Sequence, residues 1–121
     1  MAFAYTSLLN SSAIITTVAS TVGSLYTHGS SPATAYVRSI TLHNTNTTVE
    51  SVDIHLVPNS GGALGTAAVT NKIFAAEMAA DATIILEFPA PGLMLTALND
   101  SIQGVTTTVS KVTVAITGGT E

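Results

Sequence analysis

Three histidines are the side chains best suited to bind a metal ion or transfer a proton, and they stand at His28, His43 and His55. If the strands around the last two form a hairpin that pairs Leu42 with Val52, both imidazoles lie on one face of the sheet. They are then about 13 Å apart at about 3.3 Å per residue, which is too far to share one ion. No His-x-His or His-x-x-x-His pair and no carboxylate neighbour repairs this spacing. We therefore predict surface or interface histidines and no metal site.

Nucleophilic or acid–base catalysis has equally little support in the sequence. Serine is abundant, but no Gly-x-Ser-x-Gly elbow is present, and the chain has no cysteine. The seven acidic residues are spread singly along the chain, and we expect Asp81 and Asp100 to be turn residues that bond their own backbone. The sequence predicts a protein that is not an enzyme and that has neither catalytic residues nor a cofactor.

Arg38 is the one charged residue inside a strongly patterned strand. Its aliphatic stem could lie along the rim of the fold with the head in water. Alternatively, its planar guanidinium could pair with an acidic residue of a neighbouring subunit. We keep both interpretations open. The residues predicted to form an interface are Arg38, His43, His55, Tyr5, Leu8 and Leu9.

The strands that position these side chains are indicated by a period of two in the hydrophobic pattern. The turn "NTNTTV" separates two such segments, and Pro58 ends the second, so we predict an antiparallel hairpin. In the first strand, one face carries Tyr36, Arg38, Ile40 and Leu42, and the other carries Val37, Ser39, Thr41 and His43. In the second strand, the inward face carries Val52, Ile54 and Leu56, and the outward face carries Ser51, Asp53 and His55.

The rest of the chain continues the β pattern, with eight to ten short strands and a turn signal every ~8–12 residues. This predicts an all-β antiparallel sandwich of jelly-roll type. We expect residues 25–121 to form the sandwich and residues 1–24 to form an N-terminal arm or edge strands. The predicted core consists of Ile40, Leu42, Val52, Ile54, Leu56, Ile84, Leu86, Val112, Val114 and Ile116.

The composition excludes several classes of partner. Only three residues of the 121 are basic and they are scattered, so no clustered footprint for nucleic acid can form. No apolar segment approaches the ~20 residues needed to span a bilayer. Charged residues make up 8 % of the chain, against about 25 % in an ordinary soluble domain. A sheet surface with so little charge is typical of a chain that is packed in an assembly.

A series of motifs runs along residues 25–121: a strand ending in Asn44-Thr45, a second strand ending in Leu56-Val57-Pro58, and an asparagine before a short strand, here Asn71. The series continues through Leu95–Gly104 and closes in Ile116–Glu121. In these motifs residues 25–121 resemble a group of small virion proteins of tailed bacteriophages. The resemblance implies a structural role in the phage particle, without a location within it.

From the sequence we therefore expect a capsid decoration (cement) protein, made in the host cytoplasm, that binds the shell of the major capsid protein as a homo-oligomer, here a trimer. The alternatives are an adaptor of the neck, tail or fibre base, or a receptor- or glycan-binding module, for which the predicted loops lack aromatic residues. If the first 24 residues are an arm, a truncation starting near Ser24 should fold but lose binding to the particle.

Overall fold

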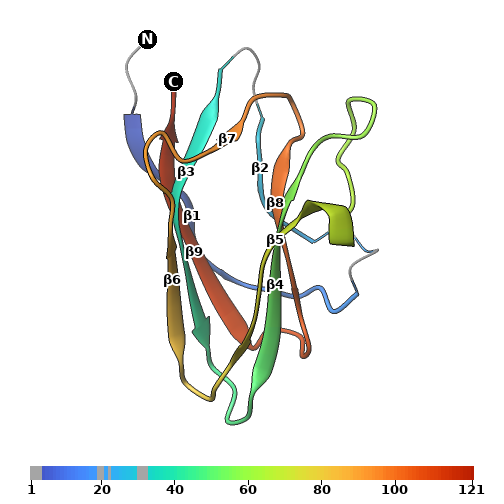
Figure 1. The fold of residues 1–121 in the computed structure, drawn as a ribbon, viewed down its shortest axis with the longest axis vertical. Coiled ribbons are helices and arrows are strands. Elements are labelled where there is room, and N and C mark those ends of the chain that lie inside the picture. Colours follow the sequence, from blue (N-terminus) through green and yellow to red (C-terminus); the bar gives the residue numbers. More distant parts are fainter. Residues whose placement is uncertain (1–3, 19–20, 22, 30–32) are drawn as a thin grey trace.

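The structure is a computed structural model that describes residues 4–18, 21, 23–29 and 33–121. The described residues form nine β-strands and one short 3₁₀ helix (Figure 1). Their bounds are β1 Ala4–Ala13, β2 Ser24–Thr27, β3 Ala35–Asn44, β4 Glu50–Val57, η1 Val69–Asn71, β5 Lys72–Met78, β6 Thr83–Glu87, β7 Leu93–Leu95, β8 Ser101–Thr106 and β9 Val112–Thr120.

The strands form two antiparallel sheets that pack face to face. Sheet A has the order β1-β9-β3-β6, with β7 also paired to β3, and sheet B has the order β2-β8-β4-β5. The chain passes from one sheet to the other between most consecutive strands, which is the winding of a jelly roll. The predicted all-β antiparallel sandwich is confirmed.

The predicted hairpin between β3 and β4 is wrong. In sheet A, β3 pairs with β9, β6 and β7, whereas β4 pairs with β5 and β8 in sheet B. The turn at 45–49 therefore carries the chain across the sandwich instead of folding it back on itself (Figure 1). A period of two shows that each strand has one buried face, but it does not show which strand is its neighbour.

The core lies between the two sheets and matches most of the predicted set. Seven of the predicted residues are fully buried, while Leu56, Ile84 and Leu86 are half-buried against them. Further buried side chains complete the cluster, namely Ile14, Ala35, Val37, Met78, Leu95 and Ile102.

A β-bulge in β3 changes the predicted faces of that strand. The partners of Val37 and Ser39 on β9 are consecutive residues, so β3 carries one extra residue, Arg38, between them. Val37 is buried in the core, whereas Tyr36 and Arg38 are half-buried on the outer side. The prediction that placed Tyr36 and Arg38 on the face of Ile40 is therefore wrong, because a bulge shifts the alternation by one residue.

The N-terminal segment forms an edge strand instead of an extended arm. β1 pairs with β9 along sheet A, and Ile14, which follows it, is 1 % exposed in the core. This is the edge-strand alternative of the prediction for residues 1–24. A truncation starting near Ser24 removes a strand and a core residue, so we now expect it to lose stability.

Ile14→Ala tests this integration of the N-terminal segment. The substitution removes buried methyl groups, so we expect the free energy of unfolding to fall by about 2–4 kcal/mol. The neighbouring Ile15 is 68 % exposed, and Ile15→Ala should change stability by about 0.5 kcal/mol or less. Urea unfolding of both variants makes the comparison. Equal, small effects would mean that the segment is an arm.

Candidate functional site

The outer face of sheet A presents rows of mostly short side chains that carry no charge except at Glu87, and we call it the A face. Its rows follow from the strand register, since paired residues in antiparallel strands point to the same side. The A face consists of the row Thr83, His43, Thr113 and Ala13, the row Ile85, Thr41 and Ala115, and the row Glu87, Ser39, Thr117 and Ser7.

The outer face of sheet B is different in both charge and coverage. It carries Asp53 and Lys72, which form an ion pair of 3.2 Å, and the exposed Glu77. The loop 58–71 lies over its other half, where the Gln103 amide donates a hydrogen bond of 2.8 Å to the carbonyl of Gly65. Figure 1 shows this loop beside β4, β5 and β8. The A face is thus the more open of the two, and its central row carries no charge.

His55 was predicted to lie on the surface, but it is fully buried beneath the loop 58–71. Its Nδ1 lies 2.9 Å from Asn71 Oδ1 and 3.1 Å from the carbonyl of Ala68. Both of these atoms are acceptors, because the Ala68 amide itself donates to Asn71 Oδ1, so Nδ1 carries the proton. Its Nε2 is buried without a hydrogen-bond partner among the described residues. His55 therefore holds the loop in place and cannot line a surface.

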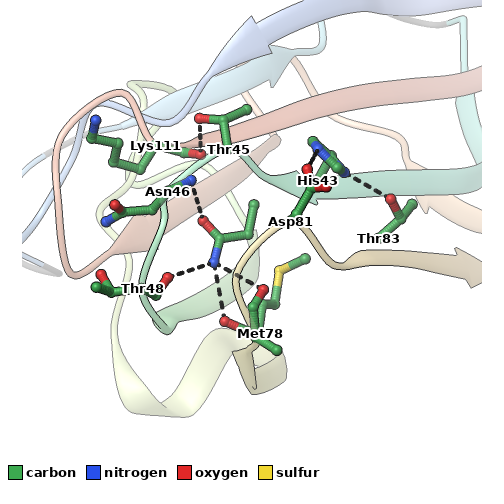
Figure 2. A network of polar contacts seen from close by, with 10 residues as sticks. His43, Thr45, Asn46, Thr48, Met78, Asp81, Thr83 and Lys111 are labelled. Atoms are coloured by element: carbon green, nitrogen blue, oxygen red, sulfur yellow. Dashed lines mark hydrogen bonds and ion pairs between the residues drawn. The ribbon is translucent and has the colours of Figure 1, made fainter.

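The other two histidines also have structural contacts. His28 is 1 % exposed and its Nε2 lies 2.8 Å from the carbonyl of Ala33, so its predicted surface position is wrong. His43 does lie on the A face, where Nδ1 is 2.7 Å from Thr83 Oγ1 and Nε2 is 3.1 Å from Asp81 Oδ1 (Figure 2). These two bonds fasten β3 to the edge strand β6 and to the turn before it.

The described residues contain no group of three or more His, Asp or Glu side chains close enough to hold a metal ion. No helix within the described part of the chain is long and apolar enough to cross a membrane. Asp100 fulfils its predicted role as a turn residue, since its carboxylate accepts the amide of Ala97 at 3.0 Å. It also accepts the amide of Asn59 at 2.9 Å, which ties the start of the loop 58–71 to the turn before β8.

The end of the sandwich near the 45–49 turn is held by the buried side chain of Asn44. Its Nδ2 donates to the carbonyls of Thr48, Met78 and Ala79 at 3.0–3.1 Å, and its Oδ1 accepts the amide of Asn46 at 2.9 Å. One side chain therefore joins the β3–β4 turn to the β5–β6 turn. In the sequence Asn44 stands out only as a motif residue at the end of a strand, and the hydrophobic pattern does not mark it as buried.

Glu50 adds the third turn to this network. It is 1 % exposed, and its carboxylate accepts the side-chain amide of Asn46 and the backbone amide of Thr108, both at 2.9 Å. Burial alone raises the pKa of Glu50, but these hydrogen bonds, together with the positive charge of Lys111, hold the pKa below its ordinary value. The carboxylate is thus ionised at neutral pH and ties the β8–β9 turn to β4.

The far end of the A face carries the predicted interface residues Arg38 and Tyr5. The guanidinium carbon of Arg38 lies 5.8 Å from the centre of the Tyr5 ring, and Tyr5 is 66 % exposed. Leu8 and Leu9, by contrast, are half-buried and pack against the core. An interface role is left open for Arg38, Tyr5 and His43 but has little support for the two leucines.

Comparison of the chain with protein-family models, with curated proteins and with solved structures finds no match. The geometry of the A face must therefore support the functional argument. Hydroxyl and methyl groups on a regular sheet can pack against another protein and exchange hydrogen bonds with it.

The hydrogen-bonded carboxylates of Glu50 and Asp100 predict a loss of stability in acid. The pKa values of Glu50 and Asp100 are lower in the folded than in the unfolded chain, so their contribution is present above the unfolded pKa and is lost as pH falls through the folded pKa. We expect Glu50→Gln to be less stable than the parent at pH 7, with a gap that narrows as pH falls from about 5 to about 2.

Urea unfolding at several pH values measures this gap. The matched control is Glu77→Gln, since Glu77 is exposed on β5. A gap for Glu50→Gln that stays constant from pH 7 to pH 2 would show that the ionised carboxylate does not hold the three turns.

Proposed function

We propose that this protein is a non-enzymatic structural subunit of a tailed-bacteriophage particle, and that the A face packs against a neighbouring protein there. The observation that carries this proposal is the central row of the A face, formed by Ile85, Thr41 and Ala115. Ile85 is 58 % exposed on that row. An uncharged, partly apolar face does not help a domain to stay in solution. A subunit of an assembly can bury such a face against its neighbour.

Three further observations support the proposal. The cores of protein interfaces are depleted in charged residues, as is the centre of the A face. The jelly roll is a fold that viral capsid proteins use, although the same fold also serves lectins, so it does not decide function alone. The resemblance of residues 25–121 to small phage virion proteins favours the viral alternative.

Within the particle we propose the role of capsid decoration (cement) protein, acting as a homo-oligomer on the shell of the major capsid protein. No bond is made or broken in this role. Each bound copy favours the assembled shell by mass action, so the shell resists disassembly in proportion to the free energy of binding. The network of Asn44 and Glu50 supports this function, because turns fixed before binding leave less conformational entropy to lose on contact.

Thr41→Lys tests the proposal at the centre of the A face. Thr41 points outward between Ala115 and Ile85, so the variant should fold, but it places a charge where the neighbour must pack. We expect the parent protein to co-sediment saturably with purified phage heads and the variant to bind at least about 10-fold less tightly. The control is Ser51→Lys, because Ser51 is exposed on the outer face of sheet B.

Binding of Thr41→Lys with parental affinity would overturn the A face as the contact. If the parent protein binds purified tails and not heads, the decoration role is wrong and the neck or tail alternative replaces it. If it binds neither and is absent from purified particles by mass spectrometry, the virion proposal itself fails.

A further inference from the structure

One end of the A face combines the side-chain types that are enriched at protein interfaces. In the strand register, Tyr5 pairs with Gly119, Gly119 with Tyr36, and Tyr36 with Met94, so the four residues form one row. Tyr5 is 66 % and Met94 is 49 % exposed. Tyrosine, methionine and arginine are over-represented in interfaces, and the most important contacts in them are often Tyr and Arg.

Arg38 beside this row is held in a fixed position by packing. Gly92 has a φ of +103°, and a Cβ there would lie 3.0 Å from Arg38 Cδ and 2.3 Å from the Val37 carbonyl, so the 88–92 turn sits directly on the arginine stem. The guanidinium stacks over Tyr5 at 5.8 Å. Its Nε is buried without a hydrogen bond among the described residues. Little side-chain entropy is therefore lost when the head meets a partner.

The charge of Arg38 is not neutralised within the described part of the chain, where the salt-bridge contacts are those of Lys72 with Asp53 and of His43 with Asp81. Glu121 lines the same cavity of about 320 Å³ as Arg38, together with Tyr36 and Pro91, without forming an ion pair with the arginine. We call this end of the A face, with Tyr5, Tyr36, Met94, Arg38 and Glu121, the patch. It presents the positive Arg38 and the negative Glu121 around one cavity. A partner that is complementary to it must present both signs in the opposite order.

We propose that the partner at this patch is a second copy of the same chain, related by a two-fold axis. Around such an axis Arg38 of each copy faces Glu121 of the other, and the two rows of Tyr5, Tyr36 and Met94 pack together. A two-fold contact requires a self-complementary surface, and the adjacent opposite charges provide one. An acidic or a basic segment of another protein would satisfy only one of the two groups and leave the other against a like charge.

This inference deepens the proposed function, on whose assembly role it rests, and it changes one expectation from the sequence. A closed two-fold contact forms a dimer, so it replaces the trimer. The A face is then divided between two contacts, because the central row around Thr41 remains the proposed contact with the particle.

Charge reversal tests the two-fold contact in purified protein. We expect the parent to sediment at twice the chain mass of 12.3 kDa. Arg38→Glu and Glu121→Arg should each weaken self-association by about 30-fold or more. The double variant with both substitutions should dimerise again, and the two single variants should form a heterodimer when mixed. Glu77→Arg on sheet B is the matched control, and circular dichroism confirms that each variant is folded.

A parent that is monomeric at all concentrations, a parent trimer, or a double variant that does not recover would each overturn the two-fold contact. These failures are distinguishable from failure of the proposed function. A monomeric protein that still binds phage heads through Thr41 overturns only the dimer, whereas a charge-dependent dimer that binds no particle overturns only the virion role.

Discussion

Burial of one face of each sheet against the other is the constraint on which the rest of the structure depends. Strand side chains alternate, so placing Ile40 and Leu42 in the core places Thr41 and His43 outside. The core therefore determines which residues face outward. The types of those outward residues are not constrained by packing, so they can serve function. The central row of the A face carries no charge, whereas on sheet B a loop covers part of the outer face and an ion pair neutralises two of its charges.

Polar side chains at the two ends of the sandwich allow the loops to stay ordered. Asn44 and Glu50 satisfy backbone groups of three turns at one end, while His55, Gln103 and the half-buried Asp100 hold the loop 58–71 at the other. Except at Asp100, each contact pairs a buried group that would destabilise the fold by about 1–3 kcal/mol if it had no partner. The A face lies between these two ends, so it is a preformed surface.

The sequence was sufficient for the fold class and most of the core because both depend on the alternation within single strands. The sequence was insufficient for features that depend on contacts between segments far apart in the chain. Two strands joined by a short turn look like a hairpin, but β3 and β4 lie in different sheets. The bulge at Arg38 moves Tyr36 to the outside, and the loop 58–71 buries His55, and neither event leaves a local signal. The patch brings together Tyr5 of β1, Arg38 of β3 and Glu121, which follows β9, so sequence pattern alone could not assemble it.

We propose that the central row of the A face is buried when the protein binds a phage particle. Hydroxyl-radical labelling of the protein, free and mixed with purified particles, measures this directly when it is read by mass spectrometry. We expect labelling of Ile85 to fall several-fold on binding, while labelling of Ile73, which is 41 % exposed on β5, stays the same. Protection of Ile73 with unchanged labelling of Ile85 would contradict this proposal.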